Sequence, residues 1–200
     1  LEPSLNLDVK HNGYGRWLEE NHPDFYEELK EKGRDLLHIP RENHMNHWAA
    51  ERTIDFIENW EDERPFFVEM SVFDPHNPYK DYPEEMLDLI DGDKIPAPVY
   101  KEGEMKGKPA GVLREHEHSY LGNFKDFTSD DIMKMRKGYH ASIALIDLEI
   151  GRVLKALEEK GIADSTLVIF VSDHGDMLGD HQLSVKGAFF YDSCTKVPLI

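Results

Sequence analysis

Acidic side chains outnumber basic ones 40 to 23 in this chain of 200 residues, which gives a formal net charge of −17. This balance argues against a nucleic-acid partner, because contacts with a phosphate backbone need clustered lysine and arginine. The single cysteine, Cys194, excludes an intrachain disulfide and leaves the redox compartment open. No apolar run approaches the roughly 20 residues of a membrane helix, so we expect no membrane span.

The first third of the chain predicts two helices. Residues 21–24 place a proline at a first helical position, and the helix that follows is expected to run to about Lys32 and to end at Gly33. A second helical pattern covers residues 45–60.

A strand and a long excursion come next. Residues 66–73 form a nearly continuous apolar run of strand length. Residues 74–127 are rich in Pro, Gly, Lys and Glu, and they predict a surface excursion with one helix near residues 84–90.

The last third gives the clearest pattern. Residues 128–131 read as a helix start, and apolar residues then recur at helical spacing up to a stop at residues 160–161. The expected buried stripe consists of Ile132, Met135, Tyr139, Ile143, Ile146, Ile150, Val153, Leu154 and Leu157. Residues 166–172 form a second apolar strand, and residues 196–200 begin a third.

These elements predict an α/β fold. Unbroken apolar strands are typical of a mostly parallel sheet with helices on both faces. We expect residues 1–200 to be part of a single catalytic domain. The chain ends inside an expected strand, so we also expect an incomplete sheet with exposed edges.

The strongest chemical signal follows the second strand. Asp173 supplies a hard oxygen ligand and His174 an imidazole nitrogen, while Gly175 lets the backbone turn sharply. Open α/β sheets bind ligands at the carboxyl ends of their strands. We therefore predict that Asp173 and His174 form part of a metal site; the alternative is an ordinary polar turn.

Two further candidates lie shortly after this pair. Lys186 comes thirteen positions after Asp173 and could neutralise an oxyanion at a metal site, whereas its alternative is a surface lysine. His181 lies in the same loop, which combines polar residues with apolar ones, and we expect it to contact substrate.

His76 follows the first strand, between two prolines that restrict the backbone and orient the imidazole. A held histidine suits proton donation to a leaving group, although the turn could also be purely structural. Structural or surface roles are expected for His44, His47, His116, His118 and His140.

Taken together, these motifs resemble the sulfatase family of the alkaline phosphatase superfamily. The matching phrases are residues 64–67 with 73–79, residues 139–154, and residues 167–187 with 197–200. The resemblance implies that Asp173 and His174 bind a divalent cation, commonly Ca²⁺ and in some relatives Mn²⁺ or Zn²⁺. It also implies that His76 and Lys186 contact the sulfate and the leaving-group oxygen.

The chain departs from the family pattern in one respect. Family members carry an aspartate pair that completes the metal site and a Cys-x-Pro-Ser-Arg type motif whose Cys or Ser becomes formylglycine, the nucleophile. Neither is present here, and Cys194 lacks the flanking residues, so we expect it to pack rather than react. The 200 residues alone are therefore expected to be an inactive internal fragment.

Two functions remain open from the sequence. The first is hydrolysis of an anionic sulfate ester, or of a phosphate or phosphonate ester, by the full-length protein, for which we expect a periplasmic or secreted location. The second is a noncatalytic binding module, which the absent nucleophile motivates.

Overall fold

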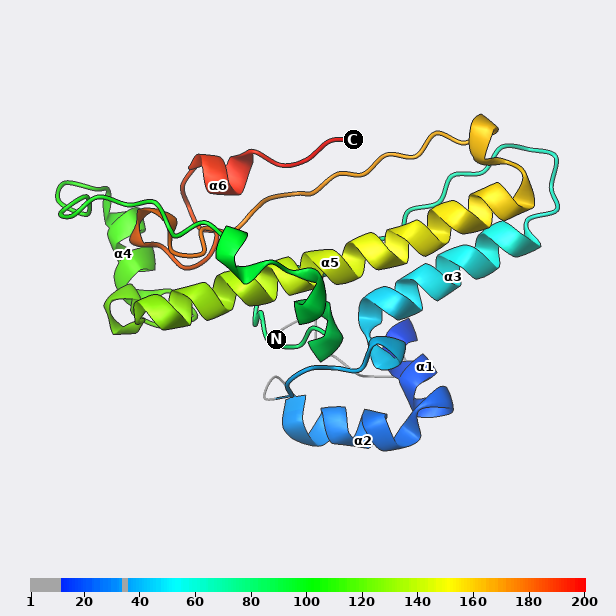
Figure 1. Ribbon diagram of the computed structural model, residues 1–200, viewed down its shortest axis with the longest axis horizontal. Coiled ribbons are helices and arrows are strands. Elements are labelled where there is room, and N and C mark those ends of the chain that lie inside the picture. Colours follow the sequence, from blue (N-terminus) through cyan, green and yellow to red (C-terminus); the bar gives the residue numbers. More distant parts are fainter. Residues whose placement is uncertain (1–11, 34–35) are drawn as a thin grey trace. The chain divides into compact units, whose positions relative to one another are not determined.

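A computed structural model describes residues 12–33 and 36–200, and helices dominate them (Figure 1). None of the helices in these ranges is long and apolar enough to cross a bilayer. The helices are α1 (Gly13–Asn21), α2 (Pro23–Lys32), α3 (Met45–Asn59), α4 (Ala110–His118), α5 (Ser129–Lys160) and α6 (Asp192–Thr195), with short 3-10 turns η3 (Arg41–Asn43), η4 (Glu84–Leu89), η5 (Gly92–Lys94), η6 (Phe124–Asp126), η7 (Ala163–Ser165) and η8 (Asp180–Gln182).

The chain divides into two compact units, and one of the boundaries between them falls within α5. Unit 1 comprises Leu1–Asp91 and Gly138–Thr166, and unit 2 comprises Gly92–Lys137 and Leu167–Ile200. Each unit is described by itself. Membership of both in one catalytic domain stays a prediction.

The predicted helices of unit 1 are confirmed. Proline occupies the start of α2, and Gly33 ends this helix with a φ of 52°. The pattern at residues 45–60 forms α3. The structure adds α1, whose start is capped by the side chain of Asn12 accepting from the Gly15 N–H at 3.1 Å.

The long helix α5 is also confirmed at both ends. Thr128 and Asp131 cap its start reciprocally, since each side chain accepts from the other residue's backbone N–H. Gly161 follows its end with a φ of 76°. The predicted buried stripe is wrong at Ile143 and Leu154, each 40% exposed.

The buried face of α5 in unit 1 includes Ala141, Leu145 and Ala156, which the predicted stripe left out, together with the predicted Leu157. Ala141 and Leu145 are fully buried beside Met86, and Ala156 and Leu157 pack with Ile57 of α3. Figure 1 shows α3 running alongside this part of α5.

The excursion is more ordered in unit 2 than its composition suggests. It contains α4, which the sequence did not reveal, while the expected helix near 84–90 is only the 3-10 turn η4. Val112 of α4 packs with Met177, Leu183 and Phe189. This cluster fixes the loops that carry the candidate site residues of unit 2.

The predicted parallel sheet is not formed within residues 12–33 and 36–200. The segments 66–73 and 166–172 are extended, but backbone pairing there is limited to the isolated antiparallel bridge of Val171 with Leu199. Phe67 is 90% and Leu167 85% exposed. The physical reason is that an extended segment becomes a sheet strand only when neighbours supply a hydrogen-bond ladder.

Candidate functional site

Asp173, His174 and Gly175 form a tight turn after the extended segment 166–172. The His174 backbone N–H donates to Asp173 Oδ1 at 2.8 Å, and His174 Nδ1 lies 2.9 Å from the Gly175 carbonyl oxygen. Because Nδ1 then carries the proton that donates to this carbonyl, Nε2 is the accepting nitrogen. Nε2 lies 3.6 Å from Asp173 Oδ2, and the Asp173 side chain is 85% exposed.

The short helix α6 holds this turn in place. The Gly175 N–H donates to the Cys194 carbonyl at 2.9 Å. A Cβ at Gly175 would lie 2.1 Å from the Ser193 carbonyl oxygen, so a larger residue cannot approach α6 this closely. The Ser193 hydroxyl donates to Asp180 Oδ2 at 2.7 Å. Therefore α6 joins the Asp173–His174 turn to the loop that contains Asp180.

Lys186 is attached to the same region through Asp176. The Lys186 backbone N–H donates to Asp176 Oδ1 at 2.7 Å, and Asp176 is buried. Burial raises the pKa of the Cys194 thiol to about 11, with Asp176 raising it further and Lys186 opposing the shift. Cys194 is buried beside Met177 and is not suited to be a nucleophile at neutral pH.

The loop between these residues has an unusual backbone. Leu178, His181 and Gln182 have φ values of 47°, 53° and 56°, a region that residues other than glycine rarely adopt. Arg136 donates to the Leu178 carbonyl at 3.0 Å, and the Asp180 carboxylate accepts from the Val99 N–H at 2.9 Å. Such strain persists only where surrounding contacts enforce it, and it is concentrated at functional sites.

His76 lies in unit 1, in the turn that follows the segment 66–73. Its ring packs on Phe73 with centroids 4.4 Å apart, and its Nδ1 lies 3.0 Å from the Asn77 carbonyl oxygen. The turn rests on α5 at Gly138, where a Cβ would lie 1.9 Å from the Tyr79 carbonyl oxygen. His76 is therefore presented by a tightly packed turn, as its flanking prolines predicted.

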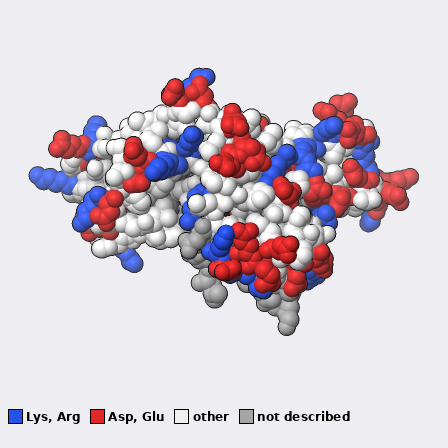
Figure 2. Space-filling model, turned by 60° about the horizontal axis from the view of Figure 1, so that its bottom comes forward, with Lys and Arg blue, Asp and Glu red and all other residues white. Residues whose placement is uncertain are grey.

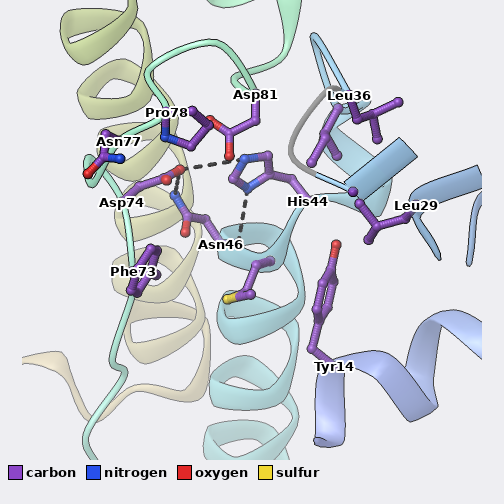
Figure 3. A pocket seen from close by; sticks show the side chains of 13 residues that line it. Tyr14, Leu29, Leu36, His44, Asn46, Phe73, Asp74, Asn77, Pro78 and Asp81 are labelled. Carbon is purple, nitrogen blue, oxygen red and sulfur yellow. Dashed lines mark hydrogen bonds and ion pairs between the residues drawn. The ribbon is translucent and has the colours of Figure 1, made fainter. Parts of the chain in front are cut away.

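A cavity of about 60 Å³ lies beside this turn (Figure 3). Asn46 Nδ2 donates to Asp74 Oδ2 at 2.9 Å, and the Asn46 backbone N–H donates to His44 Nδ1 at 3.2 Å. His44 Nε2 consequently carries a proton and faces Asp74 Oδ2 at 3.5 Å. These contacts tie Asp74, two residues before His76, to the start of α3.

The charges around the cavity are poorly compensated. Burial raises the pKa of Asp74 to about 7, and burial together with Asp74 raises that of Asp81 to about 6. Burial also lowers the pKa of His44 to about 4. Asp81 Oδ1 and both amide atoms of Asn77 lack a hydrogen-bond partner among the described residues. This cluster anchors the turn at an electrostatic cost.

Asp173 and His174 fit one half of a metal site. Within the described ranges, no group of three His, Cys, Asp or Glu side chains could hold a metal ion. The separation of 3.6 Å between their donor atoms nevertheless approaches the roughly 3.4 Å between neighbouring ligands at a right angle around Ca²⁺. The carboxylate suits Ca²⁺ or Mn²⁺ and the imidazole suits Zn²⁺, so the pair alone does not select the metal.

Four of the five predicted site residues lie in unit 2. Asp173, His174, His181 and Lys186 occupy consecutive loops that α6 and Asp176 connect. The fifth, His76, belongs to unit 1.

Sequence reasoning missed Glu104, whose Oε1 lies 2.7 Å from His181 Nδ1. The two residues are 77 positions apart, and no local pattern in the excursion distinguishes Glu104 from its acidic neighbours.

Comparison with known proteins identifies the class. A family model described as Sulfatase matches residues 6–200. The chain is 35% identical over 156 residues to an arylsulfatase of Clostridium perfringens and 31% identical over 176 residues to human iduronate 2-sulfatase. These alignments cover 78% and 83% of the chain but 31% and 32% of the relatives, so the chain spans about a third of their length.

The solved structures agree with this class. A phosphonate monoester hydrolase of Agrobacterium radiobacter superposes with a TM-score of 0.74 at 27% identity, covering 92% of this chain and 40% of that one. These matches define a protein of the alkaline phosphatase superfamily. Within it, the chain belongs to the sulfatase family.

Proposed function

We propose that the whole protein is a metal-dependent sulfuric ester hydrolase, with Asp173 and His174 as two ligands of a divalent cation, Ca²⁺ in the first instance. The observation that carries the proposal is the pair of facing donor atoms, Asp173 Oδ2 and His174 Nε2, on an exposed turn that α6 holds rigidly. Family membership supports the reaction class.

Each residue has a defined part in this proposal. A bound divalent cation polarises the transferred group. Lys186 offsets negative charge on the nonbridging oxygens, as a point charge that needs no bidentate geometry. His76 donates a proton or hydrogen bond to the departing oxygen, and His181 binds the substrate.

The overall charge makes a local cation cluster necessary. Figure 2 shows carboxylates spread over the visible face with basic side chains among them, and the net charge is −17. This field opposes an anionic ester. Lys186 and a cation at Asp173 would reverse its sign where the ester binds.

A second candidate is hydrolysis of phosphonate or phosphate esters. The specific observation in its favour is the likeness to two phosphonate monoester hydrolases, with TM-scores of 0.74 and 0.67. Sulfate and phosphonate monoesters present similar tetrahedral anionic groups, so the same lysine and metal could serve either.

The test uses the full-length protein with 4-nitrophenyl sulfate, 4-nitrophenyl phosphate and a 4-nitrophenyl phosphonate, together with mass spectrometry for formylglycine. We expect turnover of the sulfate to exceed that of the other two. A preference for the phosphonate would support the second candidate. No turnover of any ester by metal-loaded protein, with no formylglycine, would favour a noncatalytic binding module.

The proposed role of Asp173 as a metal ligand is tested separately, by measuring bound metal. In the full-length protein, Asp173→Ala should remove most bound metal, measured by elemental analysis, because a direct ligand is lost. Lys186→Ala should reduce kcat by a hundredfold or more with metal retained, as loss of one charge-stabilising group does. Loss of metal in the lysine variant would show that its role is misassigned. The 200 residues alone should bind Ca²⁺ only weakly, because two ligands do not replace its hydration shell.

A further inference from the structure

His181 is held in unit 2 by residues that the excursion contributes. Its Nδ1 lies 2.7 Å from Glu104 Oε1, and its ring stacks on Tyr191 with centroids 4.2 Å apart and planes inclined by 16°. Lys108 donates to the Tyr191 hydroxyl at 2.6 Å and lies 3.8 Å from Glu104 Oε1. The four side chains, Glu104, Lys108, His181 and Tyr191, form a connected set that we call the His181 cluster.

The backbone of His181 is also fixed. Its φ of 53° and ψ of 28° are left-handed, and its N–H donates to the Val99 carbonyl at 2.8 Å. His116 Nδ1 lies 2.8 Å from the Gln182 carbonyl on the following residue. A histidine in this conformation costs on the order of 1 kcal/mol, so the surrounding contacts have to impose it.

Glu104 determines which ring nitrogen of His181 is available to a ligand. Partial burial opposes its ionisation, but hydrogen bonds from the Lys101 N–H and from His181 lower its pKa, so the group is a carboxylate at neutral pH. A carboxylate accepts, and therefore Nδ1 of His181 carries a proton. Nε2 makes no hydrogen bond or ion pair within the described ranges, and the side chain is 35% exposed, so this nitrogen can meet a ligand.

We infer that His181 is a specificity residue that binds a hydroxyl group of the leaving group through Nε2, and that Glu104 is its positioning residue. With Nδ1 held by Glu104, Nε2 is the ring nitrogen placed to hydrogen-bond a hydroxyl group, and the Tyr191 hydroxyl and the Lys108 ammonium are further polar groups beside it. Hydroxylated leaving groups such as sugars fit this cluster better than a plain aryl group. This inference rests on the proposed ester hydrolysis.

The position of the cluster supports a role in specificity. Asp180, adjacent to His181, is bonded to Ser193 of α6, the helix that also anchors Gly175 beside the proposed metal ligands. Glu104 and Lys108 come from the excursion, a surface segment without a repeated pattern. Such loops vary without disturbing the core, and they commonly carry recognition residues.

The test compares two kinds of sulfate ester in the full-length protein. Glu104→Gln keeps the side-chain shape but removes the charge that fixes His181. We expect this variant to raise KM for monosaccharide sulfates about tenfold, the loss of one hydrogen bond to a positioned group. The loss on 4-nitrophenyl sulfate, whose leaving group offers no hydroxyl to accept from, should be several times smaller. His181→Gln should show the same larger loss on the sugar esters, and Glu104→Asp should recover part of it.

Controls separate recognition from folding. Glu102→Gln changes an exposed carboxylate two residues before Glu104, and it should change neither KM nor kcat for either kind of ester. Equal losses on both substrates, or no loss on the sugar esters, would overturn the inference. A wild-type protein that hydrolyses the aryl ester but no monosaccharide sulfate would refute hydroxyl recognition and leave the proposed function standing. Failure on every ester would refute the proposed function itself.

Discussion

Buried carboxylates behave in opposite ways in two regions of unit 1. Glu149 of α5 is fully buried, yet it accepts from Arg41 at 2.7 Å, from Arg152 at 2.7 Å and lies 3.1 Å from His47 Nδ1. Burial opposes its ionisation, but these three partners lower its pKa to about 2. Asp74, at the cavity, accepts from Asn46 and lies 3.5 Å from His44 Nε2, and burial raises its pKa to about 7. Burial alone therefore does not decide ionisation; the donors around the carboxylate do.

The largest expected effect concerns the well-paired carboxylate. Glu149→Gln should destabilise the protein by about 3–5 kcal/mol, because it leaves Arg41 without its buried counter-charge and removes one of the two carboxylates that pair with Arg152. Urea denaturation of the full-length protein measures this loss. Glu159→Gln, at an exposed position of the same helix, is the control and should change stability little. A loss below 1 kcal/mol would show that the network is energetically neutral.

Replacing the Asp180 carboxylate in unit 2 should destabilise the protein less than Glu149→Gln does. Asp180→Asn weakens its bonds to Arg136, Ser193 and Val99, at an expected cost of about 2–3 kcal/mol. It should also raise hydrogen exchange at the His181 N–H, because the left-handed turn loses its anchor. Exchange measured by mass spectrometry checks this, with exposed Asp192→Asn as the matched change. Unchanged exchange would mean that the turn holds itself.

The raised pKa of Asp74 at the cavity predicts that its contribution to the stability of the fold decreases as the pH rises. Asp74 has a pKa of about 7 in the fold and 3.8 as its ordinary value, so the fold binds its proton more tightly. Its contribution to stability is present below pH 4 and is lost as the pH rises to 7. Asp81 acts in the same direction, whereas His44, with its pKa lowered to about 4, acts against both.

Asp74→Asn tests this directly. Relative to wild type, the stability of this variant should improve from pH 5 to pH 8, by about 1.4 kcal/mol for each pH unit between pH 5 and the Asp74 pKa of about 7. Urea denaturation at the two pH values measures it, and Asp88→Asn at an exposed site serves as the control. A difference that is independent of pH would contradict the raised pKa.

The smallest effect concerns Cys194. Because its thiol pKa is raised from 9.0 to about 11, its alkylation by iodoacetamide at pH 8 should be about a hundredfold slower in the folded protein than in urea. Peptide mapping locates the modified residue. Rapid alkylation without unfolding would show that the thiol is neither buried nor shifted.

The sequence predicted those elements whose signals are local. The proline and glycine at the ends of α2, and the reciprocal cap of Thr128 with Asp131, each lie within one helical turn of the boundary they set. α4 has no side-chain cap bond at its start, and the sequence missed it. The expected sheet depended on partners that periodicity does not identify.

In the candidate site, too, residues with local sequence signals could be predicted, and residues defined by distant contacts could not. Asp173, His174, Lys186 and His181 could be proposed from the sequence because they are close together in it and follow an apolar strand pattern. Glu104 became visible only in three dimensions, since the contact that distinguishes it spans 77 positions. Similarly, no local pattern distinguishes Glu149, because its partners Arg41 and His47 lie about a hundred positions away.

The exposed extended segments have a consequence for handling the protein. Phe67, Leu167 and Ile169 lie on backbone that is already extended, at 90%, 85% and 61% exposure. Apolar edges of this kind recruit strands from other molecules, which leads to aggregation. The 200 residues expressed alone should therefore associate at micromolar concentration, and a lysine in place of Leu167 should act as a gatekeeper that delays it.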